Sequence, residues 1–169
     1  GMNSSPALAA VLLLVLSPAG CAAARGAKHP GPSPAVFSGS AALKHALAVT
    51  ALGPRPPGTP EHEKAEQYIL TQLQRLGLQP EVDAFTASTP IGPRPMKNIV
   101  VKFAGRSGQS VLVAGHYDTK REPGFRFVGA NDGGSSTGLL LELARVLKNS
   151  PPAALGVWLA FLDGEEPLA

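Results

Sequence analysis

Apolar residues recur with two periods along the chain, and these periods predict helices alternating with strands. A helical spacing of apolar positions predicts helices at about 38–52, 60–76 and 137–147. Continuous apolar runs predict strands at 78–84, 98–104, 110–115 and 157–162, of which the last two are expected to be buried, the final one on both faces. The proline-interrupted segment 86–95 is expected to be a loop. This alternation predicts an α/β fold, a three-layer α/β/α sandwich with a mixed, mostly parallel central sheet.

Local signals predict where the first two helices begin and end. Ser38 or Ser40 can cap the first helix, and Pro60 can open the second, which Gly77 closes. The expected apolar stripe of the first helix consists of Ala42, Leu43, Ala46, Leu47 and Val49. His45 lies within that helix and is expected to have a structural role.

The N-terminal segment is expected to be a targeting signal and not part of the fold. The apolar run 7–16 is shorter than the roughly 20 residues that a membrane-spanning helix needs, and small residues follow it. Ala19-Gly20-Cys21 resembles a lipoprotein cleavage site, which makes Cys21 a candidate for lipidation. We therefore predict a signal peptide or lipoprotein leader at 1–24, a Pro- and Gly-rich linker at 25–37 and a folded domain at 38–169. The mature chain is expected to be exported, as a periplasmic protein, a membrane-anchored lipoprotein or an extracellular protein, with no transmembrane span.

Composition excludes several other classes of protein. A chain of 169 residues is long enough for about one domain. Its single cysteine allows no internal disulfide and no cysteine-based zinc cluster. The net charge of +3 is small and the basic residues are scattered, which argues against nucleic-acid binding.

Three polar turns flank the predicted strands and helices, and together they indicate a metal site. His116-Tyr117-Asp118-Thr119 follows one strand, Gly129-Ala130-Asn131-Asp132-Gly133 precedes a helix, and Glu165-Glu166 follows the last strand. Ligands of open α/β sheets bind outside the carboxyl ends of the strands, where such turns would meet. Each turn taken alone has an ordinary structural interpretation, as a solvated loop or, for Asp132, as a helix cap.

The residue types suggest a division of roles. His116 can bind a metal ion if a neighbouring acceptor such as Asp118 holds its second ring nitrogen. Asp132 beside a flexible glycine pair can approach a cation. Because neighbouring side chains diverge, one of Glu165 and Glu166 can bind the metal while the other moves protons.

The segment 134–138 also fits the Gly-x-Ser-x-Gly pattern of a nucleophile elbow. That motif requires a strand running directly into the serine turn, whereas a polar loop precedes it here. A serine hydrolase is therefore not expected.

The three turns together resemble the zinc-dependent M28 peptidase superfamily, which includes aminopeptidases and glutaminyl cyclases. The resemblance implies a phosphorylase/hydrolase-like fold, with Asp132 and Glu166 as zinc ligands and Glu165 as the proton shuttle. It implies that His116 binds a second zinc ion in an aminopeptidase, with Asp118 supporting it, whereas in a single-zinc cyclase His116 need not be a ligand.

Upstream segments favour the cyclase branch of this superfamily. The segments 55–60, 83–85, 89–92 and 127–130 are similar to those of glutaminyl cyclases. The resemblance implies an acyltransferase that acts on peptide or protein N-termini, forming pyroglutamate and releasing ammonia. An M28-type aminopeptidase and a non-catalytic exported binding domain remain alternatives. Since the superfamily takes a further zinc-binding histidine from later in the chain, we expect the N-terminal part of a catalytic domain, incomplete at its C-terminus and inactive alone.

Overall fold

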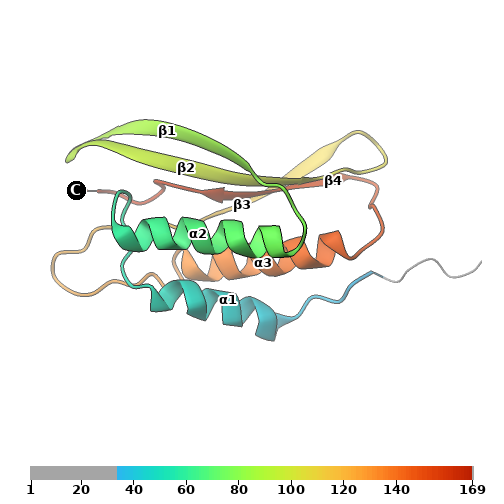
Figure 1. Ribbon diagram of the computed structural model, residues 1–169, viewed down its shortest axis with the longest axis horizontal. Coiled ribbons are helices and arrows are strands. Elements are labelled where there is room, and N and C mark those ends of the chain that lie inside the picture. Colours follow the sequence, from blue (N-terminus) through green and yellow to red (C-terminus); the bar gives the residue numbers. More distant parts are fainter. Residues whose placement is uncertain (1–33, 169) are drawn as a thin grey trace, which may run out of the picture. The chain divides into compact units, whose positions relative to one another are not determined.

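The computed structural model describes residues 34–168, which form three helices and four strands (Figure 1). Their order is α1 (Gly39–Ala51), α2 (Pro60–Arg75), β1 (Glu81–Thr89), β2 (Gly92–Phe103), β3 (Ser110–His116), α3 (Gly134–Lys148) and β4 (Gly156–Leu162). The predicted leader, Cys21 and residues 25–33 of the predicted linker lie outside the described residues. None of the helices α1 to α3 combines the length and the hydropathy that crossing a membrane would require.

The strands form one mixed sheet in the order β1-β2-β4-β3. β1 pairs with β2, and β2 with β4, in antiparallel orientation, whereas β3 and β4 run parallel. The last strand of the chain therefore lies between two earlier strands. The predicted mixed α/β fold is confirmed, and among the described strands one of the three pairings is parallel.

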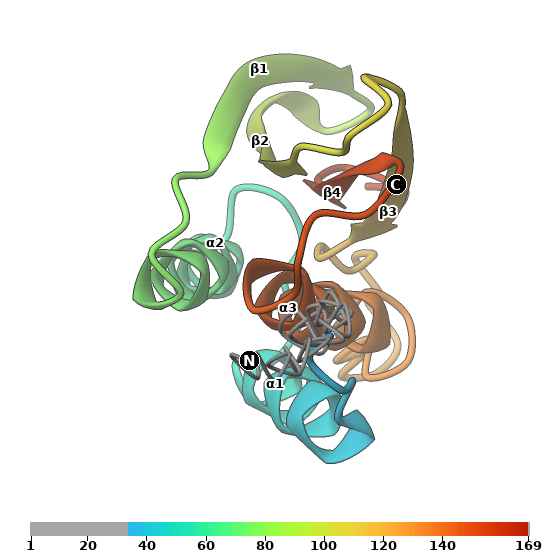
Figure 2. The same cartoon turned by 90° about the vertical axis from the view of Figure 1, so that its right-hand side faces the viewer.

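The helices of the described segment lie on one face of the sheet (Figures 1 and 2). α3 contacts the sheet, α2 packs beside α3 and reaches β2 through the Glu66–Lys97 ion pair, and α1 packs against α3 on the side away from the sheet. The core between helices and sheet consists of buried residues from both layers: Ile69, Leu73, Ile99, Val101, Leu140, Leu141, Ala144, Leu159 and Phe161. On the opposite face, Leu112 and Trp158 are paired neighbours on β3 and β4 and are 64% and 42% exposed.

The predicted starts of α1 and α2 are confirmed, whereas α3 begins at Gly134 and not at the predicted residue 137. The Ser38 side chain caps α1 by accepting the N–H of Ala41 at 3.2 Å, and Pro60 is the first residue of α2. The predicted apolar stripe of α1 is only partly correct, because Ala46 and Val49 are buried whereas Leu43 and Leu47 are about 60% exposed. α1 contacts α3 through its small residues, and this contact leaves the two leucines in solvent.

The predicted loop at 86–95 is wrong. β1 and β2 form a continuous hairpin that pairs Thr89 with Gly92 and Glu81 with Val100. Pro93 and Pro95 are tolerated because β2 acquires its second neighbour only from Ile99 onward, and proline is compatible with a strand region paired on one side.

The predicted burial of two strands is also partly wrong. β3 lies at an edge of the described sheet, and its Val111 and Leu112 are exposed. β4 has a strand on each side and buries Leu159, Ala160 and Phe161. Trp158 alternates along β4 with Val157 and Leu159, which belong to the core side, and therefore points to the other face of the sheet.

Candidate metal centre

The acidic turn follows β4 directly and consists of Asp163, Gly164, Glu165 and Glu166. Gly164 has a φ of 71°, and a Cβ at this position would collide with the sulfur of Met96, so the turn requires glycine. Asp163 is buried, the Glu165 side chain is 59% exposed and Glu166 is half-buried. The turn therefore sends its carboxylates into three different environments.

His116 ends β3 and lies between two carboxylates. Its Nδ1 is 3.3 Å from Oδ1 of Asp118, and its Nε2 is 3.0 Å from Oδ1 of Asp132. Asp118 is fully buried, and its Oδ2 accepts the backbone N–H of Glu166 at 3.1 Å. Since an ionised carboxylate only accepts, Asp118 favours the proton on Nδ1 and leaves Nε2 facing Asp132. This is the arrangement expected of a metal-binding histidine and its supporting carboxylate.

Asp132 lies in the turn before α3, and its carboxylate faces His116. Gly133 is the N-cap of α3, and the helix has no side-chain cap hydrogen bond. The alternative interpretation of Asp132 as a helix cap is therefore wrong. A Cβ on Gly133 would lie 2.7 Å from the carbonyl oxygen of Asp118, so this glycine lets the Asp132 turn approach the end of β3 closely.

His116, Asp132 and Glu166 converge on one point. One ligand atom from each lies within 4.8 Å of the other two. Burial raises the pKa of Glu166, and the neighbouring carboxylates of Asp132 and Glu165 raise it further. A cation would stabilise such crowded carboxylates, and one imidazole nitrogen with two carboxylate oxygens suits zinc. The residues therefore fit a zinc ion.

Arg55 is absent from the site residues that the sequence predicts, yet it joins the loops that carry them. It is fully buried, and its guanidinium donates to the carbonyl oxygens of Tyr117 at 3.0 Å, Val128 at 2.7 Å and Gly129 at 3.4 Å. Burial lowers the pKa of Arg55 to about 10. No hydropathy signal could have found it, because arginine is seldom fully buried.

The segment Gly134–Gly138 forms the first turn of α3 and is preceded by the loop that contains Asp132. Ser136 Oγ donates to the carbonyl oxygen of His116 at 2.9 Å, and Ser135 Oγ donates to that of Asn131. Both hydroxyls therefore hold the backbone of the site. The prediction that this segment is not a nucleophile elbow is confirmed.

A cleft of about 370 Å³ lies beside the acidic turn. The β1–β2 hairpin forms its other wall, with Phe85, Ala87, Pro90 and Met96 among the lining residues. Glu165 thus borders a space that is apolar on one side and acidic on the other.

Comparison with known proteins shows which family the chain resembles. Residues 98–168 match the model of peptidase family M28, and this stretch contains every residue of the convergent cluster. The chain is 37% identical over 124 residues to the glutaminyl-peptide cyclotransferase-like protein of Bos taurus, a match that covers 68% of this chain and 32% of the relative. It is 34% identical over 118 residues to the glutaminyl-peptide cyclotransferase of Drosophila melanogaster, covering 67% and 33%. The chain thus spans about a third of the length of these curated relatives.

Solved structures give the same result. A glutaminyl cyclase from an Acidobacteriales bacterium superposes with a TM-score of 0.72 at 41% identity, over 79% of this chain and 47% of the other. A Zn-dependent exopeptidase from Parabacteroides distasonis also superposes with a TM-score of 0.72, at 26% identity, over 81% and 50% of the two chains. By sequence and by fold, the chain resembles peptidase family M28, whose model it matches over residues 98–168, and the glutaminyl-peptide cyclotransferases.

Proposed function

We propose that the protein is a zinc-dependent glutaminyl-peptide cyclotransferase, which converts N-terminal glutamine to pyroglutamate and releases ammonia. The convergence of His116, Asp132 and Glu166, with Glu165 beside them, supports zinc-assisted acyl chemistry. The match to the cyclotransferase-like protein of Bos taurus supports the cyclase activity. This match extends over 124 residues, whereas the match to the peptidase family is confined to residues 98–168, so the similarity to the cyclotransferase covers more of the chain.

We propose a single zinc ion at this edge of the sheet, held by Asp132, Glu166 and His116. When bound, zinc polarises the oxygen of a carbonyl or amide group. Asp118 orients the His116 ring through Nδ1, and the N–H of Glu166 in turn holds Asp118. The ligands are thereby fixed by contacts within the domain.

Glu165 is suited to moving protons. Its carboxylate is mostly exposed, and its Oε2 lies 3.9 Å from Nε2 of His116, next to the metal-binding cluster. In the proposed reaction the α-amine of the substrate attacks the carbon of the side-chain amide. Glu165 accepts the proton that the amine loses and delivers one to the nitrogen that departs as ammonia.

The second candidate function is that of a metallo-aminopeptidase. The similarity to the Zn-dependent exopeptidase favours it, since that structure superposes as well as the cyclase does. The same Glu165 would then act as general base for hydrolysis of the first peptide bond.

The two candidates differ in their products. The full-length protein loaded with zinc is incubated with a peptide that begins with glutamine and, separately, with one that begins with alanine. We expect ammonia and a cyclised peptide from the first substrate, and no free alanine from the second, measured by coupled ammonia assay and mass spectrometry. Release of free amino acids without ammonia would establish the aminopeptidase instead. If the protein showed neither activity and bound no zinc, a non-catalytic binding domain would be favoured.

Glu165→Gln tests the proposed proton transfer. We expect kcat to fall by about 10²–10⁴-fold, the usual contribution of a positioned acid or base. Glu63→Gln is the matched control, because Glu63 is an exposed carboxylate on α2 outside the site. Retention of activity in Glu165→Gln would contradict the assigned role.

We also propose that the protein is exported by the leader at 1–24, with Cys21 as a lipidation site. The apolar run 7–16 and the small residues after it support this proposal. Expression with its native leader should give processed protein outside the cytoplasm, and Cys21→Ser should release any membrane-bound fraction.

A further inference from the structure

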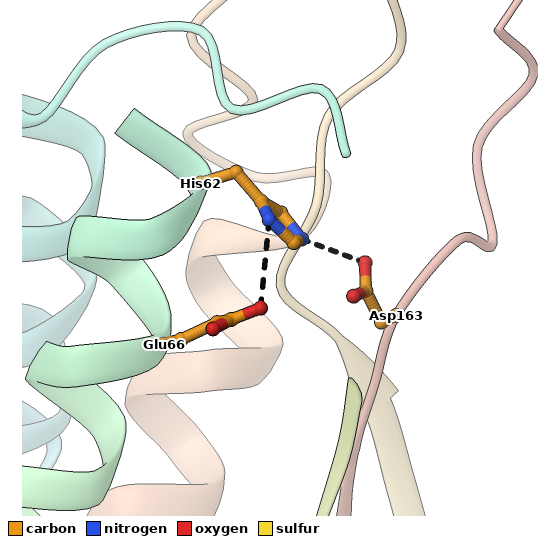
Figure 3. A group of neighbouring side chains, drawn as sticks. All are labelled: His62, Glu66 and Asp163. Atoms are coloured by element: carbon orange, nitrogen blue, oxygen red, sulfur yellow. Dashed lines mark hydrogen bonds and ion pairs between the residues drawn. The ribbon is translucent and has the colours of Figure 1, made fainter. Parts of the chain in front are cut away.

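A second cluster of polar side chains lies behind the acidic turn, and the proposed reaction does not use it. His62 and Glu66 lie on successive turns of α2, and Asp163 begins the acidic turn (Figure 3). All three are buried. His62 Nε2 is 2.8 Å from Oδ1 of Asp163, and His62 Nδ1 is 3.6 Å from Oε1 of Glu66.

The geometry of this cluster fits a hydrogen-bond network better than a metal site. The imidazole presents a different nitrogen to each carboxylate, so no single ion could replace both contacts (Figure 3). Glu66 Oε2 already has a cation, the ammonium of Lys97, at 2.6 Å. Each buried polar side-chain atom of the described residues has a hydrogen-bond partner, which leaves no donor or acceptor waiting for an ion.

The carboxylate of Asp163 is the centre of the network. Its Oδ2 accepts the backbone N–H of Lys97 at 2.8 Å and the hydroxyl of Tyr117 at 3.0 Å. Burial raises the pKa of Tyr117, and the charges of Asp163 and Glu66 raise it further, so the phenol stays protonated and can donate. Because an ionised carboxylate only accepts, Nε2–H of His62 donates to Oδ1.

These donors come from three parts of the fold. His62 belongs to α2, Lys97 to β2, and Tyr117 follows β3 directly. The His62 ring also stacks on the Tyr117 ring, with centroids 5.2 Å apart. Asp163 is thus fixed from several directions at the residue where β4 passes into the turn that carries Glu165 and Glu166.

We propose that His62 is a positioning residue for the acidic turn, holding Asp163 so that Glu165 and Glu166 reach their working positions. This inference rests on the proposed function, in which the acidic turn carries the proton shuttle Glu165 and the zinc ligand Glu166. The turn is anchored at both ends, through Asp163 to His62 and through the N–H of Glu166 to Asp118. Of the three donors to Asp163, only His62 comes from a helix, and it lies 101 residues away in sequence.

Two substitutions separate positioning from general stability. His62→Leu removes the donor and leaves Oδ1 of a buried carboxylate without a partner, whereas His62→Gln retains an N–H of similar reach. In the full-length zinc enzyme we expect His62→Leu to lower kcat by about 10–100-fold with KM unchanged, since small misplacements of reacting groups have effects of this size. His62→Gln should recover most of kcat.

His45→Leu is the matched control. His45 is also a helical histidine with a hydrogen bond to a tyrosine, Nδ1 to the Tyr68 hydroxyl at 2.8 Å, but it joins α1 to α2 away from the acidic turn. At a temperature where all variants remain folded by circular dichroism, we expect this variant to keep its kcat.

The inference would be overturned if His62→Leu kept its kcat, or if His62→Leu and His62→Gln lost activity equally. A second equivalent of zinc bound by the wild type and lost in both His62 variants would overturn it in favour of a metal site at the cluster of His62, Glu66 and Asp163. If the wild-type enzyme releases amino acids in place of ammonia, the proposed cyclase function is wrong. The role of His62 can still be tested by comparing kcat of the wild type and the His62 variants for the release of amino acids. If the wild-type protein turns over neither substrate, zinc affinity becomes the test. We then expect His62→Leu to bind zinc about tenfold more weakly than the wild type. Unchanged zinc affinity would contradict the positioning role of His62.

Discussion

Glu165 and Glu166 are neighbours in sequence with different surroundings, and this difference is the basis of the different roles that we propose for them. Glu166 is half-buried among carboxylates, and its backbone N–H is bound by Asp118. The Glu165 side chain extends into solvent at the edge of the cleft. Identical side chains can therefore take separate roles because one backbone turn exposes the first and withdraws the second.

This difference predicts an order of zinc affinities among single substitutions. Asp118→Asn should weaken zinc binding by about 10–100-fold, the usual cost of losing a supporting partner of a ligand. Glu166→Gln removes a proposed ligand and should weaken binding further, whereas Glu165→Gln should bind zinc as the wild type does. Competition with a chromophoric chelator measures all three, and equal losses in the two glutamate variants would contradict the assignment.

From positions after strands and before a helix, the sequence predicted that His116, Asp132 and Glu166 would lie together, and the structure brings them together. The sequence did not predict the residues that hold them. Arg55 and Asp163 act through hydrogen bonds to backbone and side chains that are distant in sequence, and no local pattern encodes such contacts. His62 and Glu66 did leave a signal, because with Ala65 and Ile69 they fall at helical spacing on the buried stripe of α2.

At the scale of elements, caps were more informative than hydropathy. Ser38 and Pro60 define helix starts through a local hydrogen bond and a fixed φ respectively, so they could be recognised without knowledge of the fold. The β1–β2 hairpin was missed because its prolines indicate a loop unless the strand is known to have one neighbour there.

The contact between α1 and α3 depends on a glycine. A Cβ at Gly138 would collide with the carbonyl oxygen of Ala42 and lie 2.9 Å from the backbone nitrogen of Ala46. Gly138→Ala should therefore lower the free energy of unfolding by about 1–3 kcal/mol, the usual cost of overpacking. Gly39→Ala, in α1 with nothing within 4 Å, is the control and should stabilise the protein slightly. Urea unfolding compares them, and equal effects would contradict the packing argument.

α1 and α3 are also joined by Glu142, whose ionisation should make stability depend on pH. Hydrogen bonds from Arg145 hold the pKa of Glu142 below its usual value, with a further contribution from the N–H of Ser38 at 2.7 Å, and these outweigh the effect of burial. Because the pKa is lower in the folded state, ionised Glu142 stabilises the fold above the unfolded-state pKa of about 4.3. This stabilisation is lost as the pH falls through the folded-state pKa.

Glu142→Gln should therefore lower the free energy of unfolding by about 1 kcal/mol at neutral pH, the difference between a charge-assisted and a neutral hydrogen bond. The difference from the wild type should shrink below about pH 4. Urea unfolding at a series of pH values tests this. A difference that persists unchanged in acid would show that the charge of Glu142 is not its cause.

At the scale of the whole molecule, the described domain has one covered and one open sheet face. The covered face packs against the helices and holds the core. The open face presents Leu112 beside Trp158 next to the outer edge of β3, which is unpaired in the described sheet. Apolar surface next to an unpaired strand edge promotes association.

A protein consisting of residues 34–168 should therefore self-associate through this open face. Leu112→Glu should shift its sedimentation toward the monomer. Leu43→Glu is the matched control, because Leu43 is a similarly exposed leucine on α1. If both substitutions reduced association equally, general charge repulsion and not the open face would be responsible.

The position of β4 has a consequence for how the protein is made. β2 and β3 each pair with β4, so the sheet remains in two pieces until this late segment inserts between them. The turn that follows β4 places Asp163, Glu165 and Glu166 next to their neighbours in the fold. These neighbours are His62 on α2, His116 at the end of β3 and Asp132 in the turn before α3. The proposed ligand Glu166 and the proposed proton acceptor Glu165 therefore come next to His116 and Asp132 only when β4 completes the described sheet.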